Sequence, residues 1–147
     1  RNNLNKYKGY LAKITNFTKQ KGDLNNALID ADVFIGVSGQ KNIVKKEMIK
    51  KMNRNAIVFA LSNPYPEISY EELKKLSNVK IIATGRSDLR NQVNNSLVFP
   101  FIMRYILDKK IKKINEKLLY DFAIKISNET KKLRFNRIIP KINEIKK

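Results

Sequence analysis

The sequence contains no cysteine, no histidine and no tryptophan. Without cysteine there is neither a disulfide framework nor a zinc cluster to infer, and no acidic residues show the spacing of a metal site. No apolar run approaches the roughly 20 residues of a membrane-spanning helix. The N-terminal RNNLNKYKGY has no apolar signal core. We therefore expect a soluble, cytoplasmic protein that does not associate with membranes.

Acidic residues are also few, since 13 of them stand against 31 lysines and arginines, for a net charge of +18. One interpretation is a basic module that binds nucleic acid or another polyanion. The lysines are, however, spread through KKEMIKKM, EELKKL and LDKKIKKINEK at spacings that place most of them on solvated helix faces. Lysine, asparagine and isoleucine are abundant together, as in proteins of AT-rich genomes. We favour that explanation and expect no nucleic-acid partner.

Three short apolar runs predict strands, at Val33–Val37, Ile57–Leu61 and Val79–Ala83. The first is continuous and β-branched at both ends, which is typical of a strand covered on both faces. Helical segments alternate with these runs, so the pattern predicts an α/β fold with a parallel sheet in a single domain of 147 residues.

The predicted helices are bounded by recognisable caps. Asp23 precedes the second helix, Ser69 and Glu72 form a capping-box pattern, and Asn95 or Ser96 precedes the fifth. The last helix carries an apolar stripe of Leu118, Leu119, Phe122, Ala123 and Ile126, and the basic end RFNRIIPKINEIKK is expected to pack as a tail. The helices span Tyr7–Phe17, Leu24–Ile29, Lys45–Met52, Ser69–Leu76, residues 95 or 96 to Leu107, and Asn115–Glu129.

Each predicted strand ends in polar or turn-forming residues. These are Ser38-Gly39, Asn63-Pro64, and Gly85 followed by Asn91, Gln92, Asn94 and Asn95. Ligands bind beyond the carboxyl ends of parallel strands, so the three loops should meet at one crevice. The glycine-rich turn and the acidic residue of a first dinucleotide-binding unit are missing. We therefore expect part of a Rossmann-like, doubly wound parallel sheet with C-terminal helices.

Ordered motifs at these junctions resemble one family. ADVFIGVSG (residues 31–39), IVFALSNP (57–64) with the following Glu67, ATGRSDLRNQVNN (83–95) and Phe99-Pro100 resemble the NAD(P)-binding domain of bacterial-type malic enzymes. LNKYKGYLAKITN (4–16) and RIIPK (137–141) are also similar. The resemblance implies that residues 1–147 are the C-terminal portion of that domain, without its first βαβ unit and without the N-terminal catalytic domain.

The resemblance also implies an activity, which is oxidative decarboxylation of malate to pyruvate and CO2 with NAD or NADP as hydride acceptor and Mg2+ or Mn2+ as cofactor. It assigns substrate binding to Asn63 and to Asn95 or Asn94, with Asn95 preferred, and cofactor binding to Gly36, Ser38, Gly39 and Asn63. The family's catalytic tyrosine and lysine and its metal ligands lie outside this chain. We therefore expect no catalytic or metal-binding residue within it, inactivity in isolation, and a homo-oligomer at full length.

Amides suit such a site because they offer donors and an acceptor without titrating near neutral pH. Asparagine also stabilises turns, and for Asn91 and Gln92 we favour that role.

Other residues near the strand ends have structural explanations as well. Ser38 fits the end of a strand as well as it fits a cofactor contact, and Arg86 with Asp88 is expected to form a local ion pair. Phe99 and Phe101 are expected in the core, and Phe101 and Tyr105 stand where the family commonly has glycines. A decayed gene product without activity is a further alternative.

Overall fold

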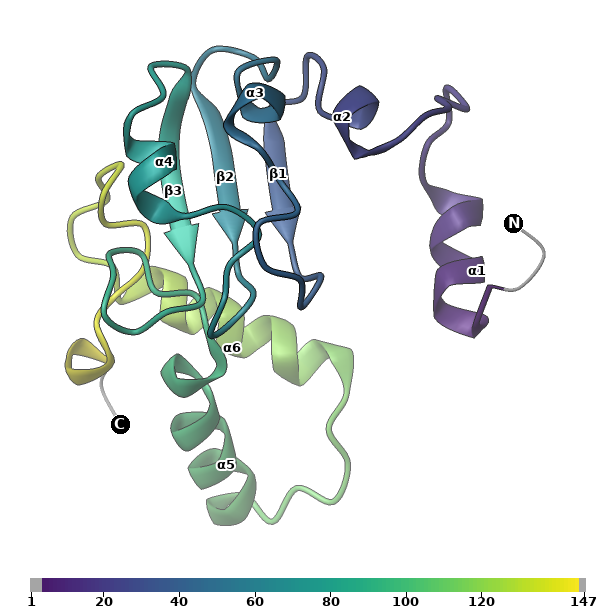
Figure 1. Cartoon of the computed structure of the whole chain (residues 1–147). Helices are drawn as coiled ribbons and strands as arrows, with labels where there is room; N and C mark the ends of the chain where they lie inside the picture. The colour runs from purple at the N-terminus through teal and green to yellow at the C-terminus, as the bar shows by residue number, and fades with distance from the viewer. Residues whose placement is uncertain (1–3, 146–147) are drawn as a thin grey trace.

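A three-stranded parallel sheet lies at the centre of the computed structural model, which describes residues 4–145. The strands β1 (Val33–Gly36), β2 (Ala56–Ala60) and β3 (Val79–Thr84) follow one another in the order β1-β2-β3 (Figure 1). In the register of the sheet, Ile35 lies opposite Phe59, and Phe59 lies opposite Ala83. The predicted α/β fold is confirmed, and each predicted strand lies within one residue of the observed one.

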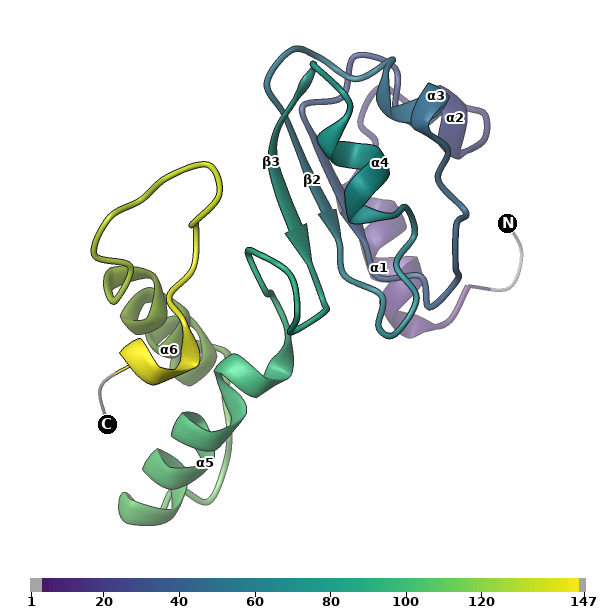
Figure 2. The same cartoon turned by 60° about the vertical axis from the view of Figure 1, so that its left-hand side comes forward.

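Short helices cover one face of this sheet. They are α2 (Leu24–Ala27), α3 (Lys46–Ile49) and α4 (Tyr70–Lys74), which lie on the same side of the strands, to their right in Figure 2. Apolar side chains from these helices and from alternate strand positions form the main core, because residues two apart on a strand point to the same face. The buried members are Leu28, Phe34, Val44, Ile49, Met52, Ala56, Val58, Ala60, Ile68, Leu73 and Leu76.

The expectation that β1 is covered on both faces is wrong for this chain. Phe34 and Gly36 are buried, whereas Ile35 is 60% exposed and Val37 76% exposed. The apolar run therefore has one face in the core and one face toward solvent, because no described residue covers the second face at this strand. A continuous apolar run does not show which neighbours are present to cover it.

The helix caps follow the sequence in part. Ser69 caps α4 by accepting from the N–H of Glu72, but the Glu72 carboxylate accepts from the Ser69 hydroxyl, so the predicted capping box is half formed. The side chain of Asp23 accepts from the N–H of Asn26 at the start of α2, and that of Asn115 accepts from the N–H of Leu118 at the start of α6 (Glu116–Asn128). Asn94, rather than Asn95 or Ser96, caps the short 3-10 helix η1 (Asn95–Leu97). A side-chain acceptor one residue earlier satisfies the first N–H groups of this turn.

The first helix stands apart from the core. The helix α1 (Lys6–Ile14) has no buried residue, and the predicted apolar face of Leu11, Ile14 and Phe17 is exposed. In Figure 1 it lies to one side of the sheet and is joined to it through α2. Its apolar face has no partner among residues 4–145.

The C-terminal helices lie beyond the carboxyl ends of the strands (Figure 1). A second, smaller core of Leu97, Ile126 and Ile145 joins η1, α6 and the tail, which contains the 3-10 helix η2 (Ile142–Glu144). The predicted packing of the tail is thereby confirmed up to residue 145; residues 146 and 147 lie outside the described part.

The predicted stripe on α6 is only partly buried. Phe122 and Ile126 are buried, whereas Leu119 and Ala123 are exposed. The ring of Phe122 meets that of Tyr105 on α5 (Phe99–Asp108) edge to face, with centroids 5.3 Å apart. One face of α6 therefore packs on α5 and the tail, and the rest of the stripe faces solvent.

Candidate functional site

Three loops meet at the carboxyl edge of the sheet. The first loop (residues 37–42) follows β1, the second (61–67) follows β2, and the third (85–94) follows β3. The backbone N–H of Gly39 donates to Ser62 Oγ at 2.8 Å, which joins the first loop to the second. Gly85 lies against the carbonyl of Leu61, where an added Cβ would overlap the oxygen. The predicted convergence of the three loops is therefore present in the backbone.

One buried carboxylate joins the first and second loops. Glu67 is 1% exposed, and its Oε1 accepts from both the N–H (2.8 Å) and the hydroxyl (2.9 Å) of Ser38. The Ser62 hydroxyl also donates to Oε1, and the Ser62 N–H donates to Oε2 at 3.3 Å. Burial alone would raise the pKa of Glu67, but the hydrogen bonds from Ser62 and Ser38 outweigh it and hold the pKa below 4.5. The side chain is therefore ionised at neutral pH.

Gly36 at the end of β1 and Gly39 in the first loop have different surroundings. A Cβ on Gly36 would lie 2.6 Å from Cδ of Glu67, so Gly36 leaves room for that carboxylate. Gly39 has a positive φ of 71° and nothing within 4 Å of a built Cβ, so its backbone is open to a ligand. Ser38 is exposed, but its hydroxyl donates to Glu67 and accepts from the N–H of Gln40 at 3.1 Å.

Asn63 lies in the second loop directly before Pro64, to which it is joined by a cis peptide bond. Its side chain is exposed, and it makes no hydrogen bond to any residue that the structure describes. It follows Leu61 and Ser62, which contact the third and first loops respectively. Asn63 is therefore placed between the other two loops with its amide available.

Asn94 and Asn95 differ although they are neighbours. Asn94 Nδ2 donates to the carbonyl of Gly85 at 2.8 Å, and Asn94 Oδ1 accepts from the N–H of Ser96 at 3.0 Å. Both ends of the Asn94 amide therefore hold the third loop together. Asn95 is exposed, and its side chain has no hydrogen-bond partner within residues 4–145. Of the pair, Asn95 offers the available amide.

Asn91 and Gln92 have the structural roles expected of them. Asn91 has a φ of 53° and is 7% exposed, which agrees with the predicted turn role. Its Nδ2 donates to the carbonyls of Ile82 (2.8 Å) and Phe135 (3.1 Å), and its Oδ1 accepts from the N–H of Ile138 (3.0 Å). Gln92 donates to Ser96 Oγ at 2.9 Å. Asn91 thus fastens the C-terminal tail to β3, which the sequence did not predict.

The predicted ion pair in the third loop is confirmed. Arg86 donates to both carboxylate oxygens of Asp88, at 2.9 and 2.7 Å. These hydrogen bonds from Arg86 are the main reason that the pKa of Asp88 is lowered. Both side chains are exposed, so the pair shapes the loop and contributes little to stability.

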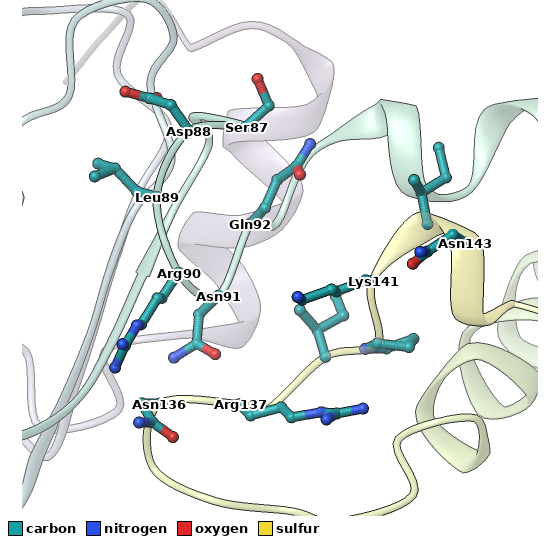
Figure 3. A pocket seen from close by; sticks show the side chains of 13 residues that line it. Ser87, Asp88, Leu89, Arg90, Asn91, Gln92, Asn136, Arg137, Lys141 and Asn143 are labelled. Atoms are coloured by element: carbon teal, nitrogen blue, oxygen red, sulfur yellow. The ribbon is translucent and has the colours of Figure 1, made fainter.

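A cavity of about 730 Å³ lies between the third loop and the tail. Figure 3 shows Ser87 to Gln92 on one side, with Asn136, Arg137, Lys141 and Asn143 on the other. The cavity wall includes none of Asn63, Asn94 and Asn95. The predicted substrate residues therefore lie at the strand ends outside this cavity.

Residues 4–145 contain no group of three or more histidine, cysteine, aspartate or glutamate side chains that could hold a metal ion. Glu67 is 1% exposed, and serine hydroxyls and backbone N–H groups donate to its carboxylate. The expectation that metal ligands lie outside this chain stays a prediction. Within the same residues, no helix is both long and apolar enough to cross a membrane.

Comparison with known proteins decides the family. A sequence model described as "Malic enzyme, NAD binding domain" matches residues 1–147. The chain belongs to the malic enzyme family. Over 94% of this chain, the sequence is 43% identical to the NAD-dependent malic enzyme of Geobacillus stearothermophilus. Over 79% of this chain, it is 45% identical to the NADP-dependent malic enzyme of Halomonas elongata.

Solved structures agree with the sequence match. The NAD-dependent malic enzyme of Thermotoga maritima superposes on 95% of this malic enzyme chain with a TM-score of 0.83 and 45% identity. The predicted Rossmann-like fold and the family resemblance are thereby confirmed. The chain spans 29% and 26% of the two curated relatives and 36% of the Thermotoga chain, so it corresponds to about a third of a malic enzyme.

The sequence did not single out Glu67 as a site residue. It recognised Glu67 only as an acid after the Asn-Pro motif, because its partners Ser38 and Ser62 belong to two loops whose contact is tertiary. The available signal was an acidic residue outside any predicted helix, followed directly by the apolar Ile68.

Proposed function

We propose that residues 1–147 are the C-terminal portion of an NAD(P)-binding domain in a malic enzyme that converts malate to pyruvate and CO2. The proposal rests on family membership and on one structural observation, the meeting of the three loops at the carboxyl edge of the sheet. Both NAD-dependent and NADP-dependent relatives match this chain, so the proposal covers either cofactor.

We assign the first loop to the cofactor and the amides to malate. The open backbone at Gly39 lets a dinucleotide approach closely, with Gly36 and Ser38 shaping the same loop. Asn63 and Asn95 then hold the malate carboxylate and hydroxyl, and Asn94 places Asn95 by fixing the loop. The nicotinamide, when bound, accepts the hydride from malate.

Neutral amides fit the substrate for a physical reason. They donate to a carboxylate and accept from a hydroxyl, yet they exchange no proton with either near neutral pH. A hydrogen bond to a charged carboxylate contributes about 1.5 to 3 kcal/mol, so loss of one amide should weaken malate binding about ten- to a hundredfold. The Mg2+ or Mn2+ ion and the acid–base residues belong, in this proposal, to segments outside the chain.

The proposal extends to the whole protein. We infer a cytoplasmic homo-oligomer acting on malate, with no membrane or nucleic-acid partner, by analogy with the family to which the chain belongs. These properties belong to the complete enzyme, of which the chain represents about a third by length.

The test compares two polypeptides in one assay. Nicotinamide reduction is followed with malate and Mn2+ for residues 1–147 alone and for a longer polypeptide that adds the upstream part of the enzyme. We expect turnover only from the longer polypeptide, because the shorter one lacks metal ligands and acid–base residues. Turnover by residues 1–147 alone, or none by the longer form, would contradict the proposal.

A further inference from the structure

A single buried side chain, that of Glu67, bonds the first loop and the second loop at once. Four donors from the two loops surround Glu67: the N–H and hydroxyl of Ser38, and the N–H and hydroxyl of Ser62. Gly36, at the end of β1, leaves room for the carboxylate. Asn63, the proposed substrate residue, directly follows Ser62. Gly39, the proposed cofactor contact, directly follows Ser38 and donates to Ser62 Oγ. The carboxylate is therefore bonded to the residue that directly precedes each proposed binding element.

We propose that Glu67 is a positioning residue, whose ionised carboxylate fixes the cofactor loop against the substrate loop, and that Ser38 serves this anchor instead of donating to the cofactor. The inference rests on the proposed function for its consequence in binding, but the anchor itself is a property of residues 4–145.

The hydrogen count supports the role assigned to Ser38. A serine hydroxyl has one proton to donate, and that of Ser38 goes to Glu67 Oε1 at 2.9 Å. The hydroxyl oxygen of Ser38 already accepts from the N–H of Gln40 at 3.1 Å. The hydroxyl of Ser62 is used in the same manner, since it donates to Glu67 and accepts from Gly39. Neither hydroxyl retains a proton for a ligand.

The surroundings of Glu67 require the charged form. Its partners are all hydrogen-bond donors, and none of the ion pairs among the described residues includes it. The segment packed against its backbone contributes only N–H groups, because Val44 donates to the Glu67 carbonyl and Asn42 to that of Pro66. The nearby Lys41 stacks over the Tyr65 ring at 5.0 Å. The carboxylate is therefore held by dipoles rather than by a cation.

Glutamine is the informative replacement because it keeps the shape of glutamate. In Glu67→Gln one oxygen can still accept from Ser38, but the other becomes an NH2 group that faces the Ser62 N–H. Two donors then oppose each other in a buried site. The matched control is Glu47→Gln, which removes an exposed carboxylate on α3 that lies 3.8 Å from Lys46.

The first arm measures amide hydrogen exchange by NMR in residues 1–147. In Glu67→Gln we expect exchange at Ser38, Gly39 and Ser62 to rise about ten- to a hundredfold, while Val58 in β2 and every site in Glu47→Gln keep the wild-type rate. Unchanged exchange in the two loops of Glu67→Gln would overturn the anchor, whether or not the protein is a malic enzyme.

The second arm measures the dissociation constant of the dinucleotide in the longer, malate-active polypeptide. We expect Ser38→Ala and Glu67→Gln each to weaken binding about tenfold, the double variant to be no weaker than either, and Ser38→Thr to restore the wild-type value. Independent losses that multiply in the double variant would mean that Ser38 bonds the cofactor directly, which would overturn its assignment. If the longer polypeptide has no activity, the proposed function fails while the exchange arm still decides the anchor.

Discussion

Asn91 is the residue that holds the third loop and the C-terminal tail in one unit. Its amide donates to carbonyls of β3 and the tail and accepts one N–H of the tail, and it is 7% exposed. In Asn91→Asp, a carboxylate would face the Ile82 and Phe135 carbonyl oxygens, so we expect a loss of about 2 to 3 kcal/mol in the free energy of unfolding. Urea denaturation measures this loss.

The control for Asn91 is Asn136→Asp, which makes the same chemical change at an exposed position of the tail. We expect that variant to stay within about 0.5 kcal/mol of the wild type. Equal stability of the two variants would show that the hydrogen bonds of Asn91 do not hold the tail.

Glu67 predicts a specific dependence of stability on pH. Its pKa in the folded protein is below the ordinary 4.5, so the stabilisation is fully present above 4.5 and is lost as the pH falls through the lowered value. At pH 7 we expect Glu67→Gln to be less stable than the wild type by about 1.5 to 3 kcal/mol. The difference should shrink in acid. Urea denaturation at pH 7 and at pH 3 measures it, and a difference that is the same at both values would contradict the assignment.

Single residues show how much of the site the sequence could predict. The strand pattern predicted only that the loops after the three strands meet at one edge of the sheet. The roles of Gly39, Asn63 and Asn95 came from the family resemblance and stay predictions. Asn95 was preferred over Asn94 as the substrate residue, and the structure adds that Asn94 caps the turn, a role that the sequence predicted for Asn95 or Ser96. Glu67 could not be assigned a role, because its partners lie 5 and 29 residues away and only the fold brings them together.

Elements were predicted better than their surroundings. The strands were found because a run of β-branched and apolar residues has few other structures available to it. The prediction that β1 is covered on both faces is wrong, because the cover of a strand depends on residues that are distant from it in the sequence. Phe101 and Tyr105, which stand where the family commonly has glycines, both find room in the packing of the C-terminal helices. Tyr105 packs on Phe122 of α6, and Phe101 packs against the cluster of Leu97, Ile126 and Ile145.

The packing of α6 yields a prediction with a control on the same helix. Ile126 is 6% exposed in the cluster with Leu97 and Ile145, whereas Leu119 on the same predicted stripe is 51% exposed. Ile126→Ala should lower the free energy of unfolding by about 2 to 4 kcal/mol through the cavity it leaves. Leu119→Ala should cost less than about 1 kcal/mol. Comparable losses in chemical denaturation would show that the two faces of α6 are not distinguished by packing.

At the scale of the molecule, one face of the sheet is left open at β1 among residues 4–145. Val33, Ile35 and Val37 expose apolar side chains on β1 and just after it. The strand pairs with β2 on one side only within the described part of the chain. An exposed apolar edge strand favours self-association.

We therefore expect residues 1–147 alone to self-associate as concentration rises, and Ile35→Lys to reduce this by placing a charge on the open face. Sedimentation velocity over a concentration series measures it. The control is Leu107→Lys, which changes an exposed apolar residue on α5 and should leave the association unchanged. If Ile35→Lys and Leu107→Lys behave alike, the open face is not the surface that associates.

The net charge of +18 is the feature behind the alternative prediction that the chain binds nucleic acid. Several ion pairs on the helices are local, such as Arg104 with Asp108 and Lys117 with Asp121, and they sit on exposed faces. Binding that depends on phosphate contacts would weaken steeply with salt. A salt titration against DNA would therefore separate that alternative from the enzyme.

The KM for malate in the longer polypeptide tests most directly the proposal that the Asn63 and Asn95 amides together bind the substrate. We predict that Asn63→Ala and Asn95→Ala each raise this KM about ten- to a hundredfold, while Asn128→Ala at the end of α6 leaves it unchanged. A KM for malate that stays at the wild-type value in both Asn63→Ala and Asn95→Ala would contradict the account.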